Sequence, residues 1–268
     1  MTALAAASEA QRDACIGAGE AMRMVDAQNG ALFLDVDGTL LDLAAQPDAV
    51  SVPEGLVGTL ARAASKLQGA LALVSGRTID EIDRLFAPLR LRASGVHGAQ
   101  IRIEPGQPTR ISANARELPA SLRKALSLML KRFPGILIED KDFGVAVHYR
   151  LNPEIAANLR EALRELIAAE PNQDLEIEDA HYAFEVKRAT FDKGKAVALF
   201  LTYEPFRGRL PIFIGDDTTD ESGFAAVTAR GGRAYSVGRP RSGAIGFFEA
   251  PQAVRDWLAA FAACGEGE

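Results

Sequence analysis

The stretch ALFLDVDGT at residues 31–39 decides how the rest of the sequence is interpreted. Its first four residues are all apolar, which is typical of a strand buried on both faces of a parallel sheet. The strand ends at Asp35, and residues two apart on an extended chain point the same way, so Asp35 and Asp37 face one crevice. Ligands of open α/β sheets bind beyond the carboxyl ends of such strands. Taken alone, Asp-x-Asp-Gly also suits an ordinary turn, but its position after a buried strand favours a site.

A second acidic cluster follows another apolar strand. The run LPIFI at residues 210–214 leads directly into Gly215-Asp216-Asp217, with Asp220 and Glu221 in the next turn. Carboxylates that share a crevice repel each other unless a cation lies between them or one holds a proton. Mg²⁺ binds a few carboxylates together with water and phosphate oxygens, so this cluster and Asp35 predict a magnesium site. The alternative is an acidic helix start, in which the carboxylates interact with the helix dipole.

Other residues are suited to binding a phosphate group. The buried run LALV at residues 71–74 ends at Ser75-Gly76-Arg77, which offers a hydroxyl and backbone amides. Lys193, at the start of a predicted helix, would bring a positive charge to Asp35 and to a bound phosphate. Ser75 also suits a simple helix cap, and a lysine at a helix start is commonly solvated. Arg77 and Arg150 suit either phosphate binding or pairing with surface acids.

The composition excludes several functional classes. The chain has 268 residues, a net charge of −6 and a pI near 5.3, which argues against a nucleic-acid partner. Its two cysteines indicate neither a disulfide framework nor a zinc site and fit a reducing compartment. No apolar run approaches the roughly 20 residues that span a bilayer, and residues 1–20 lack the pattern of a signal peptide. We therefore expect a cytoplasmic protein with no membrane partner.

The order of predicted elements indicates two domains after a tail or leader helix at residues 1–28. Strands and helices alternate over residues 29–108 and 188–268, which predicts a doubly wound parallel sheet. Residues 109–187 instead predict helix, two strands, helix and two strands, with the alternating pattern of antiparallel sheets. The expected fold is thus an α/β, Rossmann-like core with an inserted α+β cap. The helices are predicted from about residue 53 and at residues 78–86, 115–133, 153–169, 193–201 and 252–263.

The order of these polar motifs resembles that of the haloacid dehalogenase superfamily of phosphatases. The resemblance implies that Asp35 is the nucleophile that forms an aspartyl-phosphate, while Asp37 is the general acid and then the base. It implies Mg²⁺ as cofactor and a cap of type IIB, the class inserted between the second and third motifs. By the same resemblance, Asp35, the Asp37 carbonyl and Asp216 hold the metal, Asp217 and Asp220 support it, and Ser75 and Lys193 bind phosphate.

Within that superfamily, the chain is similar to the trehalose-6-phosphate phosphatases from about residue 31 to 227. The shared features include GVHG at residues 95–98, EDK at 139–141 and HYR at 148–150. The resemblance implies hydrolysis of trehalose 6-phosphate, the last step of trehalose biosynthesis, and a functional link to the synthase. It implies sugar contacts from Glu139, Lys141 and Glu185, besides Ser75, Gly76 and Arg77. The chain departs from the family by lacking a proline soon after Glu185, and we expect structural roles for His97 and His148.

Three alternatives stay open at this point. A phosphatase of the same cap class would act on another sugar phosphate, such as a sucrose or mannosylglycerate phosphate. A non-catalytic domain would bind a sugar phosphate without cleaving it, although such a relative is expected to have lost Asp35 or Asp37. A phosphomutase would also form a phospho-aspartate, but it would need a bisphosphate activator.

Overall fold

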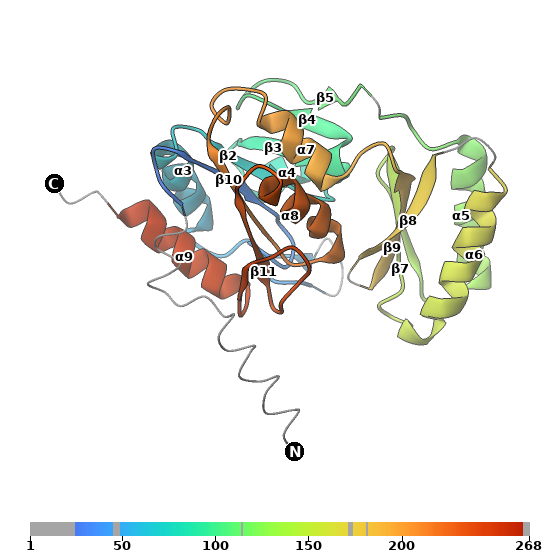
Figure 1. Ribbon diagram of the computed structural model, residues 1–268. Coiled ribbons are helices and arrows are strands. Elements are labelled where there is room, and N and C mark those ends of the chain that lie inside the picture. The colour runs from blue at the N-terminus through green and yellow to red at the C-terminus, as the bar shows by residue number, and fades with distance from the viewer. Residues whose placement is uncertain (1–24, 45–48, 114, 171–173, 181, 265–268) are drawn as a thin grey trace, which may run out of the picture.

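The chain folds around two separate β-sheets (Figure 1). A computed structural model describes residues 25–44, 49–113, 115–170, 174–180 and 182–264. A tail or leader helix is expected at residues 1–28, and residues 1–24 of it lie outside the described residues. An eight-stranded sheet forms the core, and a four-stranded sheet forms the cap.

The core sheet confirms the predicted doubly wound α/β architecture. Six of its strands run parallel, in the order β12-β11-β10-β1-β2-β3, and the edge strands β4 and β5 pair antiparallel. Residues 92–102 form two strands, because the chain reverses at the GVHG turn, where His97 adopts a left-handed backbone with φ of 52°. The strands are β1 (Gly30–Leu34), β2 (Leu71–Val74), β3 (Arg92–Gly95), β4 (Gln100–Arg102), β5 (Arg110–Ile111), β10 (Leu210–Gly215), β11 (Arg233–Val237) and β12 (Gly246–Phe248).

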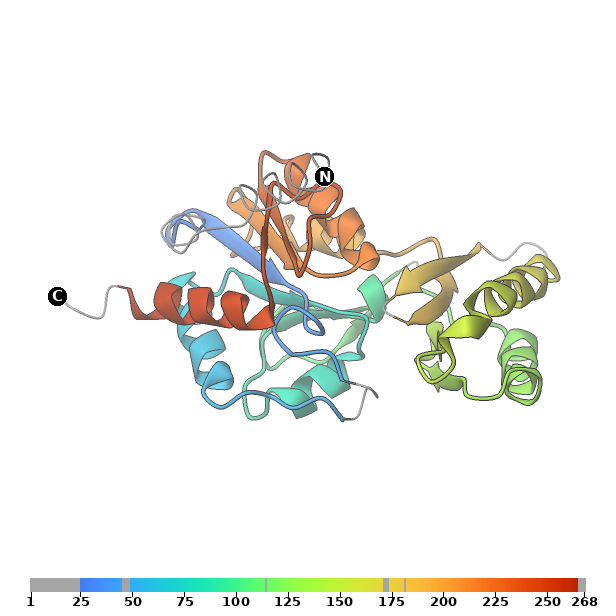
Figure 2. The ribbon, with the colours of Figure 1, turned by 90° about the horizontal axis from the view of Figure 1, so that it is seen from below.

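Helices cover both faces of the core sheet, with α3 packed on α9 and α7 packed on α8 on the other side (Figure 2). Every residue of β1 and β2 is buried, as expected for strands between two helical layers. Neither the helix α8 nor the strand β12 was predicted. The helices are α3 (Leu56–Lys66), α4 (Ile79–Leu85), α7 (Lys193–Phe200), α8 (Glu221–Thr228) and α9 (Pro251–Ala263).

The cap sheet has helices on one face only. Its strands follow the order β6-β7-β9-β8 and all pair antiparallel, as their alternating sequence pattern predicts. Val147, Phe184 and Val186 pack toward helices α5 and α6, and the alternate residues face the core. Helix α5 begins five residues later than predicted, after Pro119. The elements are α5 (Ala120–Arg132), β6 (Leu137–Asp140), β7 (Gly144–His148), α6 (Ala156–Ala168), β8 (Leu175–Ala180) and β9 (Ala183–Arg188).

The chain crosses between the sheets twice, and the two crossings are bound to each other. Arg188, at the end of β9, donates to the carbonyls of Arg116 and Glu117 in the first crossing. Strand β5 still pairs with the core sheet, so the core extends slightly beyond the expected boundary at residue 108. We propose that the cap is the segment after β5 up to about residue 187.

Within the described residues, no helix is both long and apolar enough to cross a membrane.

Candidate active site

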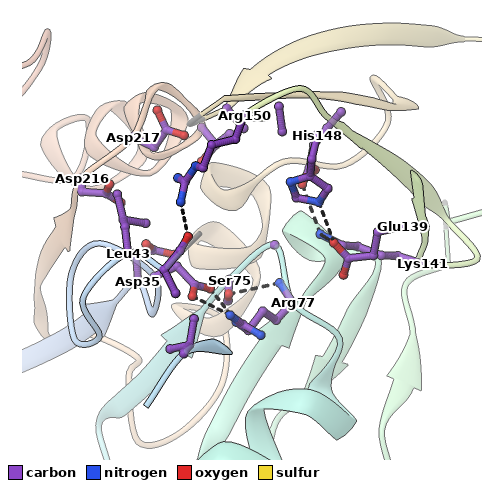
Figure 3. A pocket seen from close by; sticks show the side chains of 18 of the residues that line it. Asp35, Leu43, Ser75, Arg77, Glu139, Lys141, His148, Arg150, Asp216 and Asp217 are labelled. Atoms are coloured by element: carbon purple, nitrogen blue, oxygen red, sulfur yellow. Dashed lines mark hydrogen bonds and ion pairs between the residues drawn. The ribbon is translucent and has the colours of Figure 1, made fainter. Parts of the chain in front are cut away.

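A pocket of about 200 Å³ lies where the carboxyl ends of the core strands meet the helix-free face of the cap sheet (Figure 3). Core and cap residues line it together, as a sheet-end site with an inserted cap requires. The structure brings nearly all of the predicted site residues to this one pocket, while Asp220 lies directly behind Lys193. The predicted residues that line it are Asp35, Asp37, Ser75, Gly76, Arg77, Glu139, Lys141, Glu185, Lys193, Asp216 and Asp217.

Asp35 is buried at the end of β1, and both Asp35 and Asp220 form an ion pair with Lys193. The amino group of Lys193 donates to Asp35 Oδ1 at 2.7 Å and to Asp220 Oδ1 at 2.6 Å. All three side chains are at most 5% exposed, so the ion pairs are shielded from water. Burial alone would lower the pKa of Lys193, but the two carboxylates outweigh it and raise that pKa, which keeps the lysine charged.

The carboxylates of Asp35, Asp216 and Asp220 place one oxygen each within 4.8 Å of the others. Burial, with the charges of the neighbouring acids, raises the pKa of Asp35 to about 7 and that of Asp216 to about 9. Lys193 compensates only part of this negative charge. A methyl group at Gly38, whose φ is 75°, would overlap the Asp216 carboxylate, so a glycine is needed there. Oxygen donors with uncompensated negative charge fit a divalent cation such as Mg²⁺.

Asp37 is held by Arg77, which the sequence analysis expected to contact the substrate. Arg77 donates from Nε to Asp37 Oδ2 at 2.6 Å and from its terminal nitrogen to Oδ1 at 2.7 Å. The pair is bidentate, a geometry that only a guanidinium provides to a carboxylate. Arg77 therefore pairs with an acid in this structure, but the acid is Asp37 in the pocket and not one on the surface.

Ser75 occupies the position expected of a phosphate ligand. Its side-chain oxygen accepts a bond from the Arg77 amide at 3.1 Å, which leaves the hydroxyl proton to donate into the pocket. The next residue must lack a side chain, because a methyl group at Gly76 would lie 2.6 Å from His97 Nε2. Ser75 thus faces the same space as Asp35 and Lys193.

The cap contributes two linked ion pairs to the pocket. Lys141 donates to Glu185 at 3.2 Å and lies 3.8 Å from Glu139, which His148 contacts at 3.0 Å. Burial alone would raise the pKa of Glu185, but the charges of His97 and Lys141 hold that pKa well below its usual range. These charged groups offer directional hydrogen bonds to the hydroxyls of a polar ligand.

Three further residues that the sequence singled out, without a firm role at the site, also line this pocket. His97 forms an ion pair with Glu185, His148 contacts Glu139, and Arg150 reaches from the cap to the Ala44 carbonyl of the core. Both histidines hold cap carboxylates, and the structural role expected for them stays a prediction. The strand register carries a signal for His148, since Ala146 pairs with both Glu139 and Glu185 and so places His148 on their face. For His97 the signal is the GVHG motif at residues 95–98.

Comparisons with known proteins agree with this geometry. The sequence profile of the family described as Trehalose-phosphatase matches residues 33–241. A "Probable trehalose-phosphate phosphatase" of Sinorhizobium fredii is 43% identical over 241 residues, which are 88% of this chain and 89% of that protein. The "Trehalose-6-phosphate phosphatase" of Escherichia coli K12 is 36% identical over 212 residues, 78% of this chain and 77% of that protein.

A solved structure shares the fold at low sequence identity. The C-terminal domain of the C. albicans trehalose-6-phosphate phosphatase has a TM-score of 0.80 and 19% identity, and the match covers 92% of this chain and 97% of that domain. At this identity the likeness describes the arrangement of core and cap alone.

Proposed function

Because the chain belongs to the trehalose-phosphatase family and is a phosphatase, we propose that it hydrolyses trehalose 6-phosphate to trehalose and phosphate. The observation that carries the proposal is the composition of the pocket. A buried carboxylate and lysine suited to phosphoryl transfer face, across one space, a set of cap charges suited to sugar hydroxyls. A phosphate ester of a sugar presents both kinds of group to a site of this kind.

We propose that Mg²⁺ is held by Asp35, Asp216 and the backbone carbonyl of Asp37. The raised pKa values of Asp35 and Asp216 support this assignment, because they reflect burial and the repulsion between neighbouring acids, and a cation would offset both. When bound, Mg²⁺ supplies positive charge to the non-bridging oxygens of the phosphate. Asp220 is a less suitable ligand, since Lys193 contacts one of its oxygens and the Asp217 amide donates to the other.

In the proposed reaction, one aspartate attacks phosphorus and a second aspartate transfers the protons. Lys193 and the Ser75 hydroxyl hold the phosphate, and Asp35 attacks phosphorus in line with the leaving sugar oxygen. Asp37 donates a proton to that oxygen, so the sugar leaves as a neutral alcohol and Asp35 carries the phosphoryl group. Asp37 next takes a proton from water, which attacks the phospho-aspartate and releases phosphate. We propose that Arg77 positions the Asp37 carboxylate between these proton transfers.

The direct test is phosphate release from a panel of sugar phosphates. We expect turnover of trehalose 6-phosphate with Mg²⁺, and loss of activity on chelation with EDTA that is restored by added Mg²⁺. Sucrose 6-phosphate and glucose 6-phosphate are expected to be poorer substrates. Equal turnover of sucrose 6-phosphate would reject the trehalose assignment but keep the phosphatase, and a need for a bisphosphate activator would indicate a mutase.

Replacing Lys141 with alanine tests the role of the cap. We expect kcat/KM for trehalose 6-phosphate to fall about 10- to 100-fold, because hydrogen bonds from a charged group contribute about 1.5–3 kcal/mol each. Turnover of p-nitrophenyl phosphate, which has no sugar, should fall much less. Lys124→Ala on the exposed surface of α5 is the matched control and should leave both activities unchanged. An equal loss with both substrates would contradict sugar binding by Lys141.

We propose a cytoplasmic location, based on the two cysteines and the expectation of a reducing compartment. A functional link to a synthase of trehalose 6-phosphate follows from the proposed substrate, since that enzyme would supply it.

A further inference from the structure

Arg241 contacts the acidic turn after β10, residues 216–220, although it does not itself line the pocket. Arg241 lies between β11 and β12, and its side chain is 10% exposed. Its Nε donates to the backbone carbonyl of Asp216. Its terminal nitrogens donate to the Thr218 hydroxyl at 3.2 Å and to Asp217 Oδ1 at 3.3 Å. A single planar guanidinium thus joins three consecutive residues of the turn that carries the metal-binding carboxylate.

The loop that presents Arg241 is itself fixed to the sheet. The Ser236 hydroxyl, which is fully buried, donates to the Arg239 carbonyl at 2.7 Å. The amide of Gly238 donates to the Phe248 carbonyl at 2.8 Å, and the amide of Ile245 donates to the Ala234 carbonyl at 2.9 Å. Because both ends of the loop are bound to β-strands, the Arg241 backbone has a defined position from which the side chain reaches the turn.

The turn also has internal bonds, but they fix its other residues. The Asp217 side chain accepts from the Thr218 amide at 2.7 Å, and Asp220 accepts from the Asp217 amide at 2.9 Å. These bonds set the start of the short helix that follows. The peptide group of Asp216, which determines where its carboxylate points, is held through its carbonyl by Arg241.

We infer that Arg241 is a positioning residue that orients the Asp216 carboxylate for Mg²⁺ by holding the peptide group of Asp216 and the side chain of Asp217. This inference rests on the proposed Mg²⁺ site. Groups that hold a metal ligand in place commonly contribute 10- to 100-fold to metal affinity. A bare positive charge at this place would have the opposite effect, because it would repel the cation.

The two effects are separated by a pair of variants. Arg241→Lys keeps the charge but loses the planar fork that reaches a carbonyl, a hydroxyl and a carboxylate together. Arg241→Met removes both the charge and the fork. Arg239, two residues earlier in the same loop, is exposed, so Arg239→Lys and Arg239→Met are matched controls.

The measurement is the affinity of the metal-free protein for Mg²⁺ alone, by titration calorimetry, and for Mn²⁺ by electron paramagnetic resonance. We expect Arg241→Lys and Arg241→Met each to weaken binding by about tenfold or more, with both Arg239 variants within about twofold of the unchanged protein. The Mg²⁺ concentration for half-maximal turnover should rise by the same factor, while kcat at saturating Mg²⁺ should change less than about threefold.

Two results would overturn the inference. Tighter Mg²⁺ binding by Arg241→Met with unchanged binding by Arg241→Lys would show that only the charge acts. Unchanged affinity in both variants would show that the contacts support the loop alone. Thermal unfolding of each metal-free variant checks the fold, and if Arg241→Met does not fold, Arg241→Lys decides the question. Failure of the unchanged protein to bind Mg²⁺ would reject the proposed site, whereas normal binding with unaffected variants would reject this inference alone.

Discussion

Replacing Asp35 with asparagine is expected to reduce phosphate release from trehalose 6-phosphate by at least about 10³-fold, because an amide cannot form the covalent phosphoryl intermediate. The substitution keeps the size of the side chain, and Lys193 retains Asp220 as a partner. The measurement is kcat with saturating Mg²⁺ and substrate. Burst-phase experiments on the unchanged protein should also reveal a phosphorylated form that the variant lacks.

The stability of this variant gives an independent check. Burial and the neighbouring acids raise the pKa of Asp35, so its ionised form is costly and a neutral amide relieves the repulsion. We therefore expect a midpoint of thermal unfolding at least equal to that of the unchanged protein. Asp42→Asn, which alters an exposed carboxylate paired with Arg255 at 3.1 Å, is the control and should change neither property appreciably. Activity of Asp35→Asn near that of the unchanged protein would refute the assignment of the nucleophile.

Replacing Lys193 with methionine should affect both stability and activity. The substitution leaves the buried carboxylates of Asp35 and Asp220 without their cation, and breaking a buried ion pair in this way costs about 3–5 kcal/mol. Activity should fall by about 10²- to 10³-fold, since a positive charge aimed at the transferring phosphoryl group is lost. Chemical denaturation with urea and steady-state kinetics measure the two effects.

Matched variants separate the two roles of Lys193. Lys195→Met removes an exposed lysine in the same helix and should cost at most about 1 kcal/mol, with activity unchanged. Adding Asp220→Asn to Lys193→Met removes one unpaired buried charge, so stability should recover in part while activity stays low. Full activity of Lys193→Met would contradict its role at the phosphate, and an unchanged free energy of unfolding would contradict the buried ion pairs.

Much of the core site could be predicted because its chemistry is encoded locally. A buried strand of four or five apolar residues followed by polar ones places those polar residues at the sheet end, whatever the rest of the chain does. Asp35, Ser75 and Asp216 each follow such a strand, so their meeting in one pocket needed only the parallel order of the strands. Lys193 was harder to predict, since a lysine at a helix start is commonly solvated, and the order of the motifs decided its role.

The parts that sequence reasoning missed depend on contacts between distant segments. The pairing of Arg77 with Asp37 joins two strand ends, and the pairing of His97 with Glu185 joins the core to the cap. No periodicity within either segment specifies these pairs. The antiparallel edge at β4 was not predicted, although GVHG at residues 95–98 suits a turn; Val96, His97 and Gly98 all adopt positive φ there.

The order of strands in the core also determines when the domain can form during synthesis. The central strand β1 pairs with β10, whose partner residues lie 180 positions later in the chain. The cap sheet is built from residues 137–188 and needs no later segment, so it can form first. Until β10 emerges, the wholly apolar β1 has one unpaired edge, which is a surface that promotes aggregation. At roughly 5–20 residues per second, that exposure lasts on the order of ten seconds or more.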